Sequence, residues 1–203
     1  MTTTASPVRR WWRRRPLPET LRSVLGPDER ISVTAPCEDG RLLAVSRFGL
    51  WVVADPIGGP GADTGTGPAG GVDANPAAAR RIGWELVARA RLTARVLSVI
   101  PMRVAGSLPD GVDVLVDEPE LVFGLATRSG LTDVVHQRVR RSVAASRHLP
   151  YPGAGGWVVL RRVPGRDGLT RQVRLDPGAD ADVPGFAAAV VAVADELADT
   201  IPS

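Results

Sequence analysis

Three short, mostly apolar runs between residues 31 and 53 constrain the fold of this chain most, because tight turns join them. Apolar and polar side chains alternate strictly over 31–35, a period of two that is typical of a strand with one buried face. Asp39-Gly40 marks a reversal before the apolar run 41–45, and Gly49, before 50–53, fits a left-handed turn end. The stretch therefore predicts an antiparallel β-meander, which indicates the class of fold and leaves the function open.

Further runs of mostly apolar residues are short enough for strands, and turn signals separate them. We expect these strands at 81–87, 89–91, 96–100, 112–116, 121–125, 157–163 and 169–175. Trp51, Trp84 and Trp157 lie in or beside expected strands, and we interpret all three as anchors of the core rather than as ligand-stacking residues.

Apolar spacing also predicts three helices. A short helix is expected over 18–25, with Gly26-Pro27 as its stop. An amphipathic helix is predicted by four apolar residues that recur every four positions, namely Leu131, Val135, Val139 and Val143. We expect this helix to continue to Leu149 and to end at Pro150. A final helix is predicted by a spacing of four, three and four residues between Phe186, Val190, Val193 and Leu197.

The positive charge of the chain is concentrated at its start. All 25 basic residues are arginine, which is typical of a GC-rich genome, and five of them lie in residues 1–15 without an acid among them. The remaining 188 residues carry 20 arginines and 22 acids, so the body of the protein has no basic footprint for nucleic acid. The single cysteine, Cys37, cannot form an internal disulfide, and we interpret it as a small apolar residue.

A basic and aromatic arm, residues 1–17, is the one segment that points to a binding surface. Its candidate residues for an anionic surface are Arg9, Arg10, Trp11, Trp12, Arg13, Arg14 and Arg15. Arginines favour anionic lipid and tryptophan favours the membrane interface, whereas the same residues could also neutralise phosphates and stack on bases. An export signal is not expected, because Arg13 to Pro16 stand where an apolar region should begin.

The order of the expected elements resembles that of a pleckstrin-homology-like (PH-like) half-barrel, seven or so strands followed by one helix. The resemblance is closest at 41–53 and 81–87, where Ile82-Gly83-Trp84 stands at the Ile-Pro-Trp-like step of bacterial PH-like domains. The segments 17–22 and 29–31 are similar to the opening of uncharacterised proteins of high-GC bacteria that share this core. Such families imply a binding or scaffolding module without a named ligand.

Other motifs have simpler explanations than chemistry. Gly65 to Gly70 matches G-x-G-x-x-G and Asp63-Thr64-Gly65 matches an aspartic-protease triplet, but both lie in 56–78, which we expect to be a flexible Gly/Pro-rich loop. His136 and His148 lack zinc-ligand spacing, and we expect them to be solvated or packed on a helix. We interpret the acids of 117–120 as a charged turn. No catalytic residues, metal ligands or cofactors are expected.

The sequence therefore predicts an α+β protein with a PH-like antiparallel half-barrel closed by a helix. We expect a disordered basic arm at 1–17, the PH-like domain at 18–149, and a hairpin–helix extension at 150–203 packed on it. The expected function is a non-catalytic binding or scaffold module in the cytoplasm, attached peripherally to the inner membrane face through the arm, with an unknown protein or an anionic lipid surface as partner. A nucleic-acid-associated protein is the alternative, and an enzyme ranks third because no nucleophile, base and metal ligands converge.

Overall fold

The chain folds as an α+β protein built from two sheets and two longer helices, in a computed structural model that describes residues 16–54 and 79–201. The first sheet contains four antiparallel strands in the order β1-β2-β3-β4. Its strands are β1 (Val33–Pro36), β2 (Leu42–Val45), β3 (Gly49–Val53) and β4 (Ala79–Gly83), and the short helix α1 (Glu19–Arg22) precedes them. The meander predicted for residues 31–53 is therefore confirmed.

The glycines of the meander act in two different ways. Gly40 has a φ of 85°, the left-handed conformation that a turn there requires. Gly49 lies outside that region, so the expectation of a left-handed turn end at Gly49 is wrong. A Cβ at Gly49 would collide with the backbone carbonyl of Ile82 on β4, and glycine is therefore required there by the close approach of two strands.

The second sheet is mixed and curls into a half-barrel. Six of its strands follow the order β5-β6-β7-β11-β10-β9, and β8 pairs with β6. Its strands are β5 (Val87–Thr93), β6 (Val96–Leu108), β7 (Val112–Asp117), β8 (Leu121–Gly124), β9 (Val143–Tyr151), β10 (Ala154–Arg161) and β11 (Thr170–Leu175). The 3-10 turns η1 (Trp84–Leu86) and η2 (Pro109–Gly111) precede β5 and β7. The sequence predicted an antiparallel half-barrel. That prediction is wrong for one pair of strands, because β11 runs parallel to β7.

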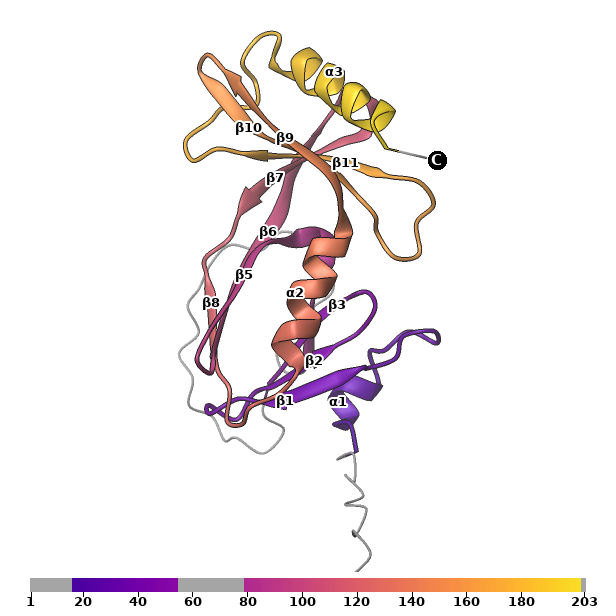
Figure 1. Ribbon diagram of the computed structural model, residues 1–203, viewed down its shortest axis with the longest axis vertical. Helices are drawn as coiled ribbons and strands as arrows, with labels where there is room; N and C mark the ends of the chain where they lie inside the picture. Colours follow the sequence, from indigo (N-terminus) through magenta and orange to yellow (C-terminus); the bar gives the residue numbers. More distant parts are fainter. Residues whose placement is uncertain (1–15, 55–78, 202–203) are drawn as a thin grey trace, which may run out of the picture.

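The long strand β6 joins the two ends of the molecule (Figure 1). Its first residues pair with β5 and with β8, whereas Met102 to Leu108 pair with β7. The first half of β6, with β5 and β8, faces the β1–β4 sheet across a buried cluster that we call the lower core. The second half of β6 belongs to the part of the sheet beneath α3 (Phe186–Asp199), whose buried cluster we call the upper core. The sequence had predicted only residues 96–100 of this 13-residue strand.

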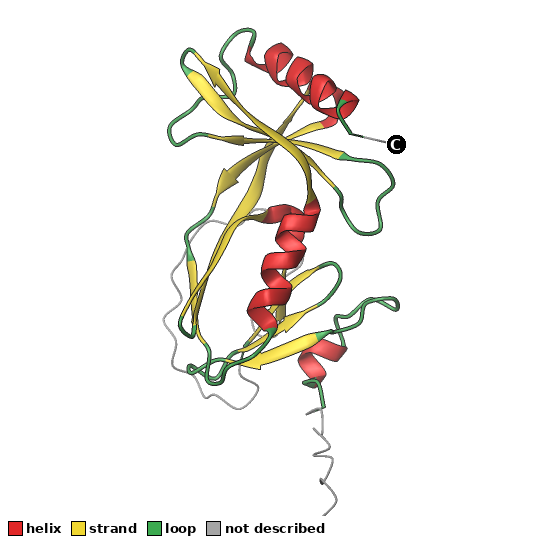
Figure 2. Ribbon diagram, in the orientation of Figure 1, coloured by secondary structure: helices red, strands yellow, loops and turns green. Residues whose placement is uncertain are grey.

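Helix α2 (Leu131–Ser142) lies beside the lower strands and runs directly into β9 (Figure 2). Leu131 and Val135 are buried in the lower core, and Val139 packs against it. The expectation that the helix continues to Leu149 is wrong, because residues 143–151 pair with β10 as an antiparallel strand. The pairing partner decides the conformation here, since residues 143–146 alone fit either a helix or a strand.

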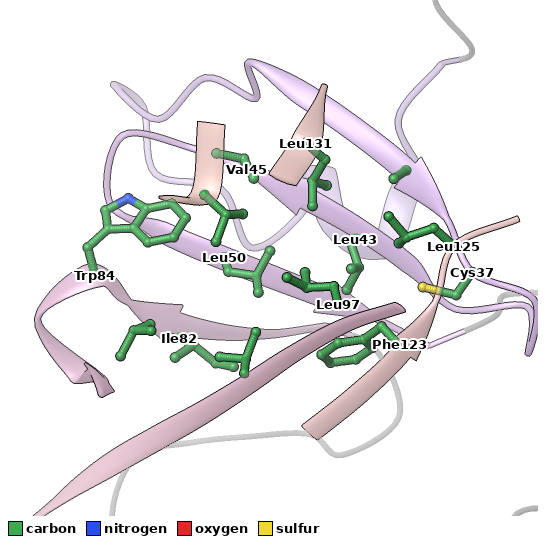
Figure 3. Packing of buried hydrophobic residues seen from close by; sticks show 14 residues of the cluster. Cys37, Leu43, Val45, Leu50, Ile82, Trp84, Leu97, Phe123, Leu125 and Leu131 are labelled. Atoms are coloured by element: carbon green, nitrogen blue, oxygen red, sulfur yellow. The ribbon is translucent and has the colours of Figure 1, made fainter. Parts of the chain in front are cut away.

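The lower core lies between the two sheets and α2. Leu43, Val45 and Leu50 of the first sheet meet Leu97 and Phe123 of the second, as the close-up shows (Figure 3). The upper core lies between the second sheet and α3, where Phe186, Val190 and Leu197 are buried as predicted, whereas Val193 is only partly buried and Ala194 is buried beside it. A third cluster covers the outer face of the first sheet beneath α1, so both faces of that sheet are covered.

Candidate functional site

The residues that the sequence marked for an anionic surface lie outside the described residues. They are Arg9, Arg10, Trp11, Trp12, Arg13, Arg14 and Arg15, and the structure gives them no geometry. The segment 56–78, with its G-x-G-x-x-G and Asp-Thr-Gly matches, also lies outside the described residues, so its prediction as a loop is not tested. The candidate sites below are therefore built from other side chains.

A hollow lies on the face of the second sheet opposite to α3, and we call it the junction hollow. Strand alternation creates it: Val158 and Leu160 of β10 pack in the core beneath α3, so Trp157, Val159 and Arg161 point to the other face. The hollow has a volume of about 150 Å³, and besides β10 it is lined by residues of β5, β6, β7, β9 and β11. Its lining includes Met102, Leu115, Ser146, Trp157, Arg161 and Gln172.

Arg161 is a buried cation, and its hydrogen-bonding partners are all neutral. Its side chain reaches across the molecule: Nη1 donates to the carbonyl oxygen of Trp84 at 3.2 Å and to Ser142 Oγ at 2.8 Å. Nη2 donates to the carbonyl oxygen of Val87 at 3.3 Å. The residue is 5% exposed, and its Nε has no partner. Arg161 thus ties η1, β5 and α2 to β10 while part of its guanidinium remains unused.

The charge of Arg161 has no adjacent counter-ion among residues 16–54 and 79–201, where no carboxylate forms an ion pair with it. Burial lowers the pKa of Arg161 to about 10, the more distant Glu85 carboxylate opposes this shift, and the Arg174 cation adds to it. At neutral pH the guanidinium is still charged, so the hollow contains a positive charge that none of the described carboxylates pairs with directly.

Gln172 is the second unsatisfied polar group at the junction hollow. It is 1% exposed, and its Oε1 has no hydrogen-bond partner. Gln172 lies on β11 directly opposite Val159 of β10, which places it on the same face as Arg161. Only three buried side-chain atoms in the described part of the chain lack a partner, and two of them belong to residues that line this hollow.

The rim of the hollow is polar and aromatic. Arg174 donates from Nε to Asp117 Oδ1 at 2.7 Å and also contacts Oδ2, and this bonding raises the pKa of Arg174 above its usual value. Trp157 is 44% exposed, and its ring lies 5.3 Å from that of His148. The interpretation of Trp157 as a core anchor is wrong, whereas Trp51 and Trp84 are buried as expected.

A second depression lies between β5 and α2, and we call it the β5 groove. Its volume is about 200 Å³, and its lining includes Arg91 and Leu92 of β5 together with Thr132, Asp133 and His136 of α2. β5 pairs with β6 on one side, and none of the described strands pairs with its other edge. Such an edge offers free backbone N–H and C=O groups to an added strand.

Arg91 and Asp133 are the charged residues that line the β5 groove, and further arginines lie on the two elements that form it. Arg89 and Arg91 of β5 are exposed, as are Arg140 and Arg141 of α2. Within the described ranges, none of these four forms an ion pair with a carboxylate. The groove therefore combines an open strand edge with cations available to an external partner.

The structure also places the cysteine, the histidines and the acidic turn that the sequence analysis singled out. Cys37 is buried in the lower core, where burial, with a smaller contribution from Asp39, raises the pKa of its thiol to about 11. His136 is exposed on α2, and His148 is exposed on β9, where it bonds Asp176 at 2.8 Å. Glu118 pairs with Arg80 at 2.7 Å. Across residues 16–54 and 79–201, no three His, Cys, Asp or Glu side chains cluster as a metal site.

Sequence reasoning missed both depressions. One signal for the junction hollow was present in the sequence. Arg161 follows Trp157 and Val159 at intervals of two in a mostly apolar strand, and a charged side chain in such a strand is rarely fully buried unless it is paired. The β5 groove could not be read from sequence, because it depends on which strand edge is left open. The longest helix in the described part of the chain, α3 with 14 residues, is too short to cross a bilayer.

Comparisons with known proteins add no relative to this picture: no protein-family model matches the chain, and neither a curated protein nor a solved structure matches it.

Proposed function

We propose that the protein is a non-catalytic binding module with a PH-like half-barrel, and that the β5 groove is where it binds a partner. The order of elements supports the PH-like assignment: a four-stranded meander, the strands β5, β6 and β8, and then α2. The hairpin formed by the far end of β6 and β7 is an insertion into that order, and it carries the chain into the upper sheet.

The observation that carries this proposal is the open edge of β5 beside α2. An extended peptide can add to such an edge by backbone hydrogen bonding, while its side chains enter the adjoining depression. Leu92 and Leu97 supply apolar surface there, and Arg89 and Arg91 supply charge. The partner is therefore an extended acidic segment of another protein with an apolar residue that enters the groove.

Selection from a random peptide library displayed on phage tests this proposal. Selected peptides should be acidic, and their addition should shift backbone amide resonances of β5 and α2 in NMR spectra. Arg91→Glu should weaken the selected peptide at least about tenfold, because it places a like charge next to the peptide. Arg103→Glu is the matched control, since Arg103 is exposed on β6 outside the groove. Peptides that map to another surface, or equal binding by both variants, would contradict the proposal.

A second function, attachment to an anionic membrane surface, is favoured by the residues of the arm. Five arginines at about 1 kcal/mol each give an upper limit near 5 kcal/mol on anionic lipid, which suits reversible attachment in the cytoplasm. Flotation of vesicles containing phosphatidylserine should carry the full chain and leave behind a chain lacking residues 1–16. Equal flotation of both contradicts the attachment. A gel shift that weakens steeply with salt would favour the nucleic-acid alternative instead.

A further inference from the structure

We propose that the junction hollow binds a small organic carboxylate, with the carboxylate on the free edge of Arg161 and the apolar body of the ligand against Trp157. This site is separate from the β5 groove and does not depend on the function proposed there. It is argued from the hydrogen-bond capacity of one guanidinium, from the shape and lining of the hollow, and from the second unsatisfied atom beside it.

The first step is the hydrogen-bond count of Arg161. A guanidinium has five N–H groups, and three of them are used by Trp84, Ser142 and Val87. The Nε–H and one Nη2 hydrogen remain, and Nε and Nη2 lie along one edge of the planar group. A carboxylate can receive this edge with its two oxygens. The group that Arg161 lacks is therefore an acceptor at Nε, and an anionic one would also balance its charge.

The second step is the size and lining of the hollow. Its volume of about 150 Å³ accommodates a ligand of about the size of benzene, which fills engineered cavities of about that volume. Met102, Leu115 and Val159 supply apolar walls, and the ring of Trp157 is available at the rim. A compact apolar body with one carboxylate fits these walls, whereas a sugar phosphate does not.

The third step concerns anions of higher charge. Arg174 also lines the hollow, but two of its nitrogens are already bonded to Asp117. Arg174 is thus paired with a carboxylate, and Arg161 is the one cation of the lining without such a pair, so a dianion such as phosphate would leave charge uncompensated next to Asp117. The arrangement favours a monoanion.

The fourth step is that the unsatisfied groups coincide. Gln172 Oε1 and Arg161 Nε are both buried without a partner, and both residues line the hollow. Buried polar atoms are satisfied in most proteins, so two unsatisfied atoms at one depression indicate that a partner is missing there. A bound carboxylate would accept from Arg161 Nε; Gln172 Oε1 is itself an acceptor, so it marks the hollow as polar but would not bond the carboxylate.

Benzoate is the probe that tests the proposal, and benzamide, which has the same shape without the charge, is its matched control. The full chain is titrated with each while the indole N–H resonance of Trp157 is followed by NMR, assigned through Trp157→Ala. Benzoate should shift this resonance saturably, with a dissociation constant in the millimolar range that suits so small a ligand. Benzamide should bind at least about tenfold more weakly, because it lacks the charge-assisted contact.

Two variants locate the site. Arg161→Lys keeps the charge but loses the planar edge and should weaken benzoate at least about tenfold. Trp157→Ala removes an exposed ring and should weaken benzoate about fivefold, as measured by isothermal titration, without unfolding the protein. Val104→Ala, exposed on β6 outside the hollow, should change nothing. The Trp157 variant decides the question if the Arg161 variant fails to fold.

Three results would overturn the proposal. They are equal binding of benzoate and benzamide, binding of benzoate that Trp157→Ala leaves unchanged, and competition by inorganic phosphate at the same concentration as benzoate. The absence of saturable binding by benzoate would also overturn it and would leave Arg161 as a purely structural tie between β10 and η1. None of these results affects the phage selection that tests the β5 groove.

Discussion

Glu29 and Arg161 are both buried charges, and the protein treats them in opposite ways. Glu29 is 6% exposed and accepts hydrogen bonds from Ser46 Oγ, from Trp51 Nε1 at 2.7 Å and from Arg81 Nη1 at 3.1 Å. Both of its oxygens are bonded, and one partner is a cation. Arg161 has neutral partners alone and retains an unbonded Nε.

The difference follows from the sheets in which the two residues lie. Glu29 lies at the outer face of the β1–β4 sheet, which α1 and its apolar cluster cover, and the opposite face is the lower core. Arg161 lies in a sheet that α3 covers on one face, while the other face is hollowed. The closed region thus pairs its buried charge internally, although Thr20 Oγ1 of α1 has no partner, whereas the open region leaves a charged donor for something outside the chain.

The largest effect that separates the two regions is expected from their tryptophans. Trp84→Ala should lower the free energy of unfolding by about 4 kcal/mol, because Trp84 is 2% exposed in the lower core and donates to the carbonyl oxygen of Ser46. Trp157→Ala should cost less than about 1 kcal/mol, because its ring is 44% exposed. Urea unfolding followed by circular dichroism measures both. Similar decreases in the free energy of unfolding would mean that the face of the second sheet with the junction hollow is not open.

Loss of Glu29 should be the next largest effect. Glu29→Leu should lower the free energy of unfolding by about 3 kcal/mol, since Ser46 and Trp51 lose their acceptor and Arg81 loses its anion. Glu38→Ala is the control, an exposed acid paired with Arg95, and it should cost less than about 0.5 kcal/mol. A Glu29 loss no greater than the control would show that the bonded cluster contributes nothing to the closed region.

Replacement of Arg161 should cost less than replacement of Glu29. Arg161→Met preserves the packing and removes an unneutralised charge, but it leaves two carbonyls and Ser142 without a donor, so about 2 kcal/mol is expected. The same urea titration compares it with Arg103→Met, which should be close to neutral because Arg103 is exposed. A cost above that of Glu29→Leu would reverse the ranking and make Arg161 the main structural tie.

The smallest effect is a pH dependence from Cys37. Burial raises the pKa of its thiol from 9.0 to about 11, so the folded state holds the proton longer than the unfolded state does. Stability from this group is complete below pH 9 and is lost as the pH rises toward 11, at no more than about 1.4 kcal/mol per pH unit. Cys37→Ala should remove that part of the slope when unfolding is measured at pH 8 and at pH 10. An unchanged slope would contradict a buried, neutral thiol.

Local patterns were sufficient for the elements whose neighbours are close in sequence. Residues 31–53 form the predicted meander because turns at Gly40 and Gly49 join strands that pair consecutively. The final helix buries Phe186, Val190 and Leu197 as predicted, with Ala194 rather than Val193 fully buried between them. In both cases the apolar period and the packed face coincide, so one reading of the sequence was enough.

Long-range pairing limited the remaining predictions. Val143 continued the helical stripe of α2, yet it begins β9, because β10 offers it a strand partner that sequence alone does not reveal. The parallel pairing of β7 with β11 joins residues about 60 positions apart and has no local signature. The junction hollow depends on both arrangements, so its residues could be identified as strand residues but not as neighbours.

The central claim, that Arg161 has donors free for a ligand whereas Glu29 is fully bonded, is tested most directly by side-chain N–H resonances. Nitrogen-15 spectra of the full chain would be recorded with and without benzoate, following the Nε–H of Arg161 and the indole N–H of Trp51. The Arg161 resonance should shift saturably, and the Trp51 resonance, held by Glu29, should not move. An Arg161 resonance that stays in place, or a Trp51 resonance that shifts equally, would contradict the account.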